Sequence, residues 1–439
     1  MSDRRAVRPG EPSTPQLERV DPGGEAGVSA VWRVRGLREA RSVLRARHAT
    51  TQAGFTAEKI PQRLKLHPIL VSDGPLHDEQ RRKVARFLAP KVVEERYREL
   101  MDECAARLVG AARGEGRCEL DELALLYTVE VTAEVVGLTE SSVPRMARRL
   151  VSFFNQPPFD ITRANLGRTN RQWAAAAKNG LVPVLRFWWS DVRPAVRARR
   201  TAPRADIISH LIEEGYSDVD ILVECVTYGT AGMVTTREFI VMAAWHLLSD
   251  EALRERYLAA EEVERLAILH EIIRLEPVVG HLYRRVQKEI PFEGSAGQEG
   301  GGQEGSGKKS QGGELESPAA EVAPDEPMGL SAQPGDLLDV CIRSANADED
   351  VVGPDPLSLC PGRELPPGVN AAGLAFGDGE HKCPGQPLAM LESDVLLRQL
   401  LALRPTIERE PDLGWDDLIE GYTLRGLTLR LPGSTRARD

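Results

Sequence analysis

The chain has 439 residues, of which 41% are hydrophobic and 28% are charged, a composition that excludes a wholly disordered or fibrous protein. Its formal net charge of −10 argues against a general nucleic-acid-binding protein, because such proteins carry a basic surface. Six scattered cysteines without a CxxC pair indicate a reducing compartment rather than a disulfide framework. Length alone allows one large domain or two to three ordinary ones.

The N-terminal segment, residues 1–26, is rich in Pro, Gly and charge, and we predict a disordered tail there. It has no apolar core of the kind that a signal peptide or a membrane anchor needs. The longest apolar stretch, residues 239–248, is too short to cross a bilayer. We therefore expect a cytoplasmic protein without a membrane anchor.

A strand is expected at 30–34, and the hydrophobic period then predicts a mainly helical region up to residue 275. The expected helices are 75–88, 92–112, 120–137, 142–154, 170–198, 205–213, 217–248, 250–258 and 262–275. Strand-like segments at 288–292 and 335–342 flank a Gly-rich insertion at 293–325, which predicts a hairpin with a long flexible loop. A last helix is expected at 387–403, and alternation at 422–431 predicts a hairpin.

The most informative segment is LAFGDGEHKCPGQPLAML, which surrounds Cys383 with three glycines. Glycines permit the backbone to approach a flat, bulky group closely. A cysteine just before a helix has its thiolate favoured by free N–H groups, and such a thiolate suits a soft or redox metal. A structural cysteine in a Gly-rich turn is the alternative. Zinc is disfavoured, because no second pair of ligands lies nearby at usable spacing.

Residues 376–385, FGDGEHKCPG, resemble the FGxGxHxCxG signature of the cytochrome P450 superfamily at every fixed position. The resemblance implies that Cys383 is the proximal ligand of the iron of haem b, with Phe376, His381 and Gly385 also contacting this cofactor. It implies a mainly α fold with small β sheets. In that fold a long distal helix lies over the haem, and the cysteine loop lies beneath it.

A second family signature, ExxR, is supplied by Glu271 and Arg274. Residues at i and i+3 share a helix face, so the two side chains can pair. Taken alone, such a pair is as well explained by a surface salt bridge. By resemblance, Arg363 closes a network with this pair that holds the cysteine loop.

Three further basic residues stand where the family contacts the haem propionates. Arg284 follows Arg274 by ten residues, and His77 and Arg81 are four apart on one predicted helix. The neighbouring stretch 81–91 has five basic and no acidic side chains. The resemblance makes it a candidate docking surface for an acidic electron donor, although a charge run is usually only a solvated face.

The expected distal helix contains Ala231, Gly232 and Thr235 at the positions of the family's oxygen-activating motif. Small residues leave room for O₂, and the threonine hydroxyl assists its activation. The family has an acid where this chain has Val234, and a valine cannot relay a proton. Ordered waters, the substrate or Glu238 are the alternative proton sources.

Family geometry also suggests an apolar substrate pocket. Its candidates are Val234, Val278, Val279 and Leu424, with the aromatic residues Phe55, Phe153, Phe154 and Phe159. No residue identifies the substrate.

The resemblance implies an oxidoreductase, a P450-type monooxygenase of the bacterial soluble type. It would insert one atom of O₂ into a small apolar molecule, of secondary-metabolite or xenobiotic type, with electrons from ferredoxin and ferredoxin reductase. A peroxide-using, coupling or nitrating enzyme and a haem-binding scaffold or sensor without turnover stay open. We expect one catalytic domain at 27–439, in which the family's first helix is missing or eroded.

Overall fold

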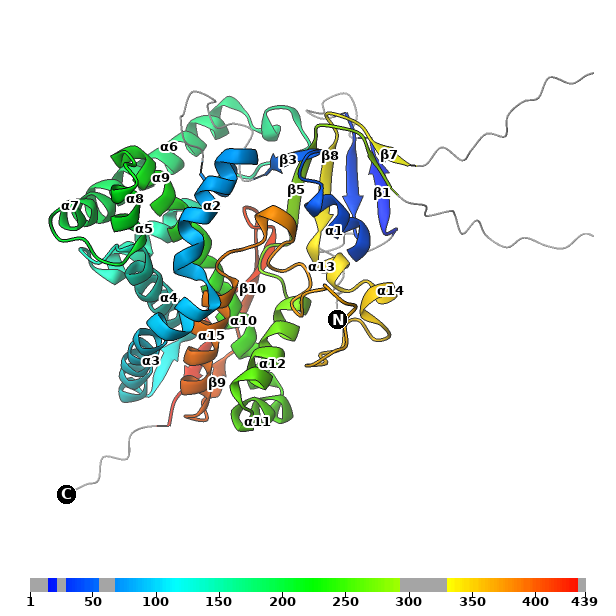
Figure 1. Ribbon diagram of the computed structural model, residues 1–439. Helices are drawn as coiled ribbons and strands as arrows, with labels where there is room; N and C mark the ends of the chain where they lie inside the picture. The colour runs from blue at the N-terminus through cyan, green and yellow to red at the C-terminus, as the bar shows by residue number, and fades with distance from the viewer. Residues whose placement is uncertain (1–14, 22–28, 55–67, 293–329, 433–439) are drawn as a thin grey trace, which may run out of the picture.

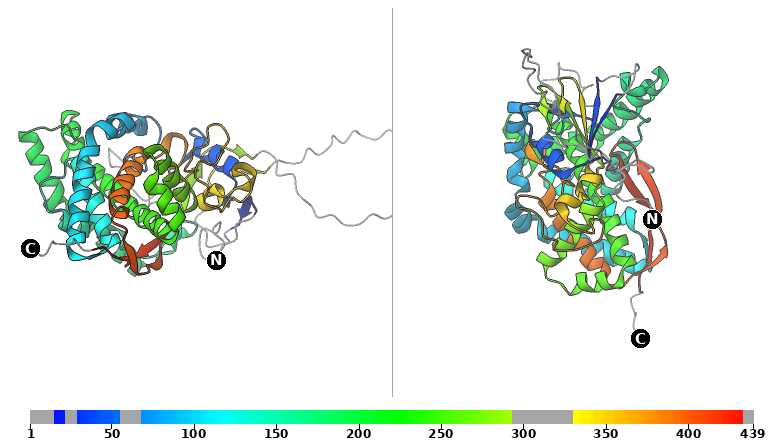
Figure 2. Two further views of the ribbon diagram at one scale, coloured as in Figure 1. Left: turned by 90° about the horizontal axis from the view of Figure 1, so that it is seen from below. Right: turned by 90° about the vertical axis from the view of Figure 1, so that its right-hand side faces the viewer.

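The computed structural model of the chain describes residues 15–21, 29–54, 68–292 and 330–432. The Gly-rich insertion at 293–325, residue Phe55 and most of the expected N-terminal tail lie outside the described residues. A helical body makes up most of the molecule, and a small sheet lies at one end of it (Figures 1 and 2). The predicted fold class, mainly α with small β sheets, is confirmed.

The helical body is built along the chain from helices joined mostly by short turns. The α-helices are α1 (Leu37–Arg45), α2 (Gly74–Leu88), α3 (Pro90–Glu115), α4 (Leu120–Val136), α5 (Val143–Val151), α6 (Asn170–Phe187), α7 (Arg193–Thr201), α8 (Ile207–Glu213), α9 (Asp218–Tyr228), α10 (Thr235–Ser249), α11 (Glu251–Ala259), α12 (Glu262–Leu275), α13 (Ile342–Asn346), α14 (Glu349–Val352) and α15 (Gln386–Leu401).

The strands form one mixed sheet and three small ones. Their bounds are β1 (Leu17–Val20), β2 (Val31–Val34), β3 (Thr50–Ala53), β4 (Arg117–Glu119), β5 (His281–Val286), β6 (Ile290–Pro291), β7 (Ser331–Ala332), β8 (Leu337–Cys341), β9 (Thr406–Arg409), β10 (Asp412–Asp416), β11 (Gly421–Arg425) and β12 (Thr428–Arg430). The main sheet has the order β1-β2-β8-β5-β3, with β2 and β8 parallel and the other pairs antiparallel. Helices α1 and α13 pack beside β8.

Local signals in the sequence explain several helix ends. Thr169 and Ser217 each form a capping box, in which the side chain accepts an N–H of the first turn. Gly116 and Gly137 end α3 and α4 in the left-handed conformation that glycine adopts without strain. For these reasons the expected helix boundaries mostly agree with the observed ones to within two or three residues.

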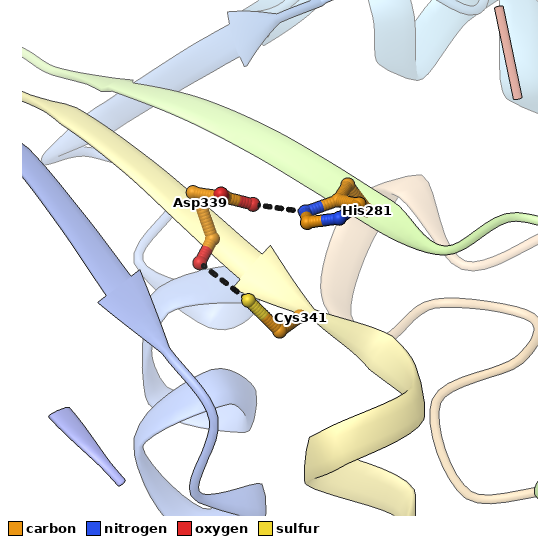
Figure 3. Close-up of side chains that lie close together, drawn as sticks. All are labelled: His281, Asp339 and Cys341. Atoms are coloured by element: carbon orange, nitrogen blue, oxygen red, sulfur yellow. Dashed lines mark hydrogen bonds and ion pairs between the residues drawn. The ribbon is translucent and has the colours of Figure 1, made fainter. Parts of the chain in front are cut away.

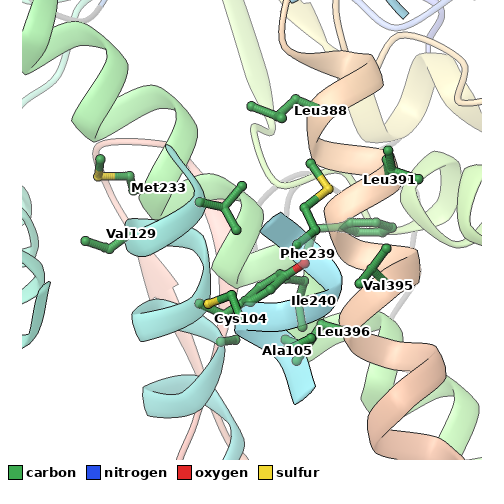
Figure 4. Close-up of a cluster of buried hydrophobic side chains, with 14 of the residues drawn as sticks. Cys104, Ala105, Val129, Met233, Phe239, Ile240, Leu388, Leu391, Val395 and Leu396 are labelled. Carbon is green, nitrogen blue, oxygen red and sulfur yellow. The ribbon is translucent and has the colours of Figure 1, made fainter. Parts of the chain in front are cut away.

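The main core lies where α3, α4, α10 and α15 meet (Figure 4). Helix α4 is apolar on nearly all sides and is therefore central. Phe239 of α10 packs among Leu391 and Val395 of α15, and Cys104 of α3 belongs to the same cluster. This packing fixes α10 against α15, the helix that follows the cysteine loop.

Two of the expected long helices are each interrupted by one π-helical segment. The helix expected at 170–198 is divided by Trp188–Val192, and the helix expected at 217–248 by η5 (Gly229–Val234). Hydrophobic periodicity does not reveal such a segment, because the chain stays right-handed and helical through it. π-helical turns are rare and concentrate at functional sites.

Two expectations about strands were wrong. Leu17–Val20, inside the tail expected to be disordered, forms β1 and pairs antiparallel with β2, because the β2 edge offers unpaired backbone groups. The hairpin expected at 422–431 does not form, although strands occur there. Strand β11 pairs with β10, while β12 pairs with β4 and β9, so the two strands enter different sheets.

The hairpin expected between the segments 288–292 and 335–342, around the Gly-rich insertion, does not form between those two segments. Strands β5 and β8 pair antiparallel, and β6 pairs with β7 rather than with the 335–342 segment. No helix in the described ranges is both long enough and apolar enough to cross a membrane.

A polar cluster is buried between strands β5 and β8 (Figure 3). His281 and Cys341 are directly opposite each other, and Asp339 contacts the His281 Nδ1 atom from the same face. His281 and Asp339 are 4% and 7% exposed. Burial alone lowers the pKa of His281, but the Asp339 carboxylate outweighs it and holds this pKa well above 6.5.

We expect Asp339→Asn to destabilise the fold by about 3–5 kcal/mol at pH 6, because it leaves a buried imidazolium without its partner. Because folding raises the pKa of His281, the His281–Asp339 pair stabilises the fold fully when the pH is below the pKa of histidine in the unfolded chain. This stabilisation is lost as the pH rises through the pKa of His281 in the folded protein. The measurement is the apparent Tm of wild type and of the Asp339→Asn variant at pH 6 and pH 9. The difference in Tm between the two proteins should be smaller at pH 9. Asp412→Asn, which removes the exposed pair with Arg409, is the control and should change little. A gap that is the same at both pH values would contradict the prediction.

Candidate active site

The cysteine loop, residues 376–385, follows the buried residue Leu374 and leads directly into α15. The Cys383 N–H donates to the Phe376 carbonyl at 2.7 Å and closes the loop. Asp378 pairs with Arg41 of α1 at 2.9 Å. The loop is therefore held both by its own backbone and by the helix next to it.

Gly379 is required by a close approach between this loop and α1. Its φ is +68°, and a Cβ there would lie 2.3 Å from the Leu44 carbonyl oxygen. A larger residue would push the loop away from the end of α1. The sequence pattern marked this glycine, but only the structure shows what it touches.

The Cys383 thiol is exposed, although protein surrounds it closely enough for burial to raise its pKa. The N–H groups of Gly385 and Gln386 and the charge of Arg81 act in the opposite direction, because each stabilises a thiolate. Phe376, at the start of the loop, is half-buried. The sulfur is thus accessible, with backbone donors directed at it, which suits ligation of iron.

Glu271, Arg274 and Arg363 meet in one buried network. Arg274 donates to both carboxylate oxygens of Glu271 at 2.7 Å, and Arg274 and Glu271 are 0% and 3% exposed. Arg363 and the Cys360 N–H donate to Glu271 Oε1 at 3.3 and 3.0 Å. The expected assembly is therefore present as a network, and it is not a surface salt bridge.

Asn346 joins this network to the cysteine loop and was not anticipated from the sequence. Its carbonyl accepts from Arg274 at 2.6 Å, and its side chain donates to the Arg274 carbonyl at 2.9 Å. The same side chain accepts the Leu374 N–H at 2.7 Å, two residues before the loop. Asparagine is common in turns, so no local signal distinguishes this residue.

The four expected propionate contacts, His77, Arg81, Arg284 and His381, lie in one region. The rings of His77 and His381 are 4.1 Å apart, and Arg81 donates to the Lys382 carbonyl at 2.6 Å. Arg284 of β5 is 3% exposed and bonds to Gln52 of β3. Helix α2, the cysteine loop and the main sheet thus contribute basic groups to the same place.

Asp73 is a further member of this region that the sequence did not single out. It accepts from His381 Nε2 at 3.2 Å and from the Gln52 N–H at 2.9 Å. Burial raises its pKa, but these hydrogen bonds and the nearby positive charges outweigh it and keep the pKa low. Its negative charge compensates only part of the basic cluster.

The basic cluster fits a bound group that carries carboxylates. Burial, followed by the charges of His381 and Arg81, lowers the pKa of His77 to about 4, and its Nδ1 atom has no hydrogen-bond partner in the described structure. Burial also lowers the pKa of Arg284 to about 10. Buried basic groups of this kind are stabilised by an anion. Together with the accessible thiol of Cys383, they match a haem with its two propionates.

The expected distal residues lie on and just after the π-helical segment η5. The widened turn leaves the Met233 carbonyl available, and Thr128 of α4 donates to it at 2.7 Å. Ala231 is exposed although the surrounding helix is mostly buried, and Gly232 is half-buried. The Thr235 hydroxyl donates to the Ala231 carbonyl at 2.5 Å, which leaves its oxygen free to accept a hydrogen bond.

Glu238 is unsuited to replace the acid missing at Val234. Arg237 bonds to Glu238 Oε1 at 2.9 Å, and Arg425 donates to both Glu238 oxygens at 2.6 and 2.7 Å. Both carboxylate oxygens are therefore engaged by guanidinium groups, which hold this side chain in charge-assisted hydrogen bonds rather than leaving it available as a relay. Val234 itself is 3% exposed.

The expected substrate contacts differ in how much surface they offer. Val278 and Val279 are half-buried, as are Phe153, Phe154 and Phe159. Leu424 is 2% exposed and belongs to the main core, so it has little surface for a ligand.

Comparison with known proteins identifies what the chain is similar to. No protein-family model matches it. It is 25% identical over 403 residues to cytochrome P450(MEG) of Priestia megaterium, covering 88% of this chain and 83% of that protein. It is 26% identical to the erythromycin C-12 hydroxylase of Saccharopolyspora erythraea, covering 77% of this chain and 74% of that one.

Among solved structures, CYP109E1 from Bacillus megaterium in complex with testosterone superposes with a TM-score of 0.69, at 19% identity and over 95% of this chain and 96% of that one. This likeness supports the fold. The curated relatives are P450 monooxygenases and hydroxylases, and the cysteine loop matches the family signature throughout. The chain is therefore similar to cytochrome P450 oxidoreductases in sequence over most of its length, in its cysteine-loop signature and in fold.

Proposed function

We propose that this P450 inserts one atom of O₂ into a small apolar organic molecule, with electrons from ferredoxin and ferredoxin reductase and haem b as its cofactor. The observation that carries the proposal is the accessible Cys383 thiol, with the N–H groups of Gly385 and Gln386 directed at it. When bound, the haem supplies the O₂ chemistry, and the protein supplies binding, orientation and electrostatics. We assign this catalytic role to one domain, residues 27–439, acting in the cytoplasm.

The chain's own residues take three roles in this proposal. Cys383 is the iron ligand. The haem carboxylates would contact His77, Arg81, Arg284 and His381, with Phe376 and Gly385 beside the ring. Glu271, Arg274 and Arg363 hold the loop that presents the cysteine, and their burial supports a structural role.

The distal residues would shape the oxygen side of the site. Ala231 and Gly232 are small and lie within the widened η5 turn, which supports a place where the helix makes room for O₂. The Thr235 oxygen can accept a hydrogen bond from a water. Because the side chain of Val234 has no ionisable proton, we propose that waters deliver protons here.

We propose a substrate in the size range of a macrolide or a steroid. The relatives' names support this class, since one hydroxylates erythromycin and one structure holds testosterone. Val278 and Val279 supply partly exposed apolar surface on the chain segment between α12 and β5.

The electron donor would dock on the outer face of α2. Arg81 donates to the Lys382 carbonyl, so this helix lies directly against the cysteine loop. Lys83 pairs with Glu79 and Glu214, which lowers the net charge of the face. Arg82 stays exposed there, and its guanidinium group is suited to an acidic surface.

The purified holoprotein is expected to form product with O₂, ferredoxin reductase, ferredoxin and NAD(P)H, once a spectral binding screen has identified a ligand. Consumption of reductant and formation of product are measured together, with peroxide alone as the parallel reaction. Product from peroxide and none from reduced ferredoxin would favour a peroxide-using, coupling or nitrating enzyme, which Val234 also supports. Ligand-induced spectral shifts without product from either source would favour a scaffold or sensor.

A further inference from the structure

A cavity of about 740 Å³ lies outside the proposed haem site, between the α2–α3 junction and the segment from α7 to α8. Its volume is within the range of small-molecule sites. Phe87 and His210, which are 3% and 6% exposed, belong to its buried lining, and Val92 and Ile212 add partly buried apolar surface.

Two basic runs that are far apart in the sequence meet at this cavity. One ends α2 and supplies Arg86, and the other is the RARRTAPR run at 197–204, which supplies Arg204. Arg96 of α3 adds a third exposed arginine, and these three are called the rim arginines. A fourth exposed arginine of the lining, Arg200, is paired with Asp218. Charge composition could not reveal that the two runs meet, because they are more than a hundred residues apart.

The three rim arginines lack carboxylate partners within the part of the chain that the structure describes. Arg86 and Arg96 lie 5.0 and 5.5 Å from the ring centroids of Phe87 and Tyr97. Arg204 makes only a backbone contact, in which its N–H donates to Ser209. Arg199, in the same lining, differs because Asp206 and Glu140 neutralise it.

His210 in the lining also has an unfilled hydrogen-bonding position. Its Nδ1 atom is buried without a hydrogen-bond partner in the described structure, and it lies 3.9 Å from a Glu213 carboxylate oxygen. Its ring lies 5.7 Å from that of Phe87. A buried polar atom without a partner is costly, and a ligand atom would relieve it.

We propose that this cavity binds a small organic anion, whose phosphate or carboxylate group contacts Arg86, Arg96, Arg204 and His210 while an apolar part rests on Phe87, Val92 and Ile212. Guanidinium groups bind such oxyanions through paired, charge-assisted hydrogen bonds. The lining also holds three acidic groups, none of which pairs with a rim arginine in the described structure. Asp206 is paired with Arg199, Glu95 lies 3.7 Å from Lys91, and Glu213 lies 3.9 Å from His210.

The charge environment of His210 agrees with this assignment. Burial, followed by the charge of Arg86, lowers the pKa of His210, and these outweigh the opposite effects of Glu214 and Glu213. A bound anion would stabilise the imidazolium and raise that pKa.

The test uses the full-length holoprotein and hexyl phosphate, with inorganic phosphate as the probe that lacks an apolar part. Isothermal titration calorimetry should give one site, with hexyl phosphate binding more tightly than phosphate. The double variant Arg86→Gln/Arg204→Gln should bind hexyl phosphate about tenfold more weakly or worse. The matched control is Arg171→Gln/Arg186→Gln, which removes the same charge from exposed positions on α6 and should bind as wild type.

Two outcomes of the titration would overturn the proposal. Equal loss in both double variants would show non-specific charge attraction, and no loss in either would place the ligand elsewhere. Octanoate in place of hexyl phosphate tests whether a carboxylate serves equally well. Binding to vesicles containing phosphatidic acid, but not to soluble hexyl phosphate, would assign the surface to lipid and contradict a small-molecule site.

An independent readout is the NMR titration of the His210 ring in ¹³C-histidine-labelled protein. Its pKa should rise on addition of hexyl phosphate, and an unchanged pKa would count against contact with the anion. Neither measurement depends on turnover, so failure of the proposed function would leave this test intact.

Discussion

Cys383→Ala protein, reduced and treated with carbon monoxide, is expected to lack completely the red-shifted Soret band that thiolate-ligated haem shows. Alanine removes the sulfur toward which the N–H groups of Gly385 and Gln386 point, and nothing else in the loop can serve as a soft ligand. Product formation should be lost with the band. The measurement is a difference spectrum, with haem content determined separately so that loss of ligation is distinguished from loss of haem.

Cys360→Ala is the matched control for this prediction. Cys360 is also exposed, and its N–H rather than its sulfur contacts Glu271. Its removal should leave the band in place. A red-shifted band retained in Cys383→Ala would overturn the assignment of the iron ligand.

Arg274→Met is expected to destabilise the protein by about 3–5 kcal/mol, because it leaves the buried Glu271 carboxylate without its bidentate partner. The loss should extend to haem retention, since Arg274 also binds Asn346, which holds the Leu374 N–H just before the cysteine loop. Apparent Tm and haem content per protein are the measurements. Arg363 stays near Glu271 but contacts only one of its oxygens, at 3.3 Å, so it compensates little.

The double variant Glu271→Leu/Arg274→Met should be more stable than Arg274→Met alone, because it leaves no unpaired buried charge. Arg163→Met is the surface control, since it breaks an exposed pair of the same i, i+3 spacing with Asp160 and should cost at most about 1 kcal/mol. If both Arg→Met variants lost the same stability, the ExxR pair would have no special structural role.

Local sequence signals predicted most of the helical body. Helices α4 and α12 were expected within one residue of their observed ends, because hydrophobic period and caps are properties of neighbouring residues. The same signals could not predict partners. Strand β1 was missed because four residues of modest hydrophobicity become a strand only when the β2 edge is present beside them.

Pairing across the chain also explains the error at the C-terminus. Residues 422–431 alternate as a hairpin would, yet β11 and β12 join different sheets through partners that precede and follow them. Alternation indicates which residues share a face, but it does not say which strand lies alongside.

The sequence by itself determined the family resemblance, the cysteine loop and the ExxR pair, because each depends on residue types at short, fixed spacing. It also showed that Val234 stands where the family has an acid. Only the tertiary structure decided that Glu238 is bound by Arg237 and Arg425 and is unsuited to replace that acid. Likewise, only packing brings Asn346 to the loop and two basic runs to one cavity. Such contacts join residues that are distant along the chain, and their geometry follows from how whole helices pack rather than from any local pattern.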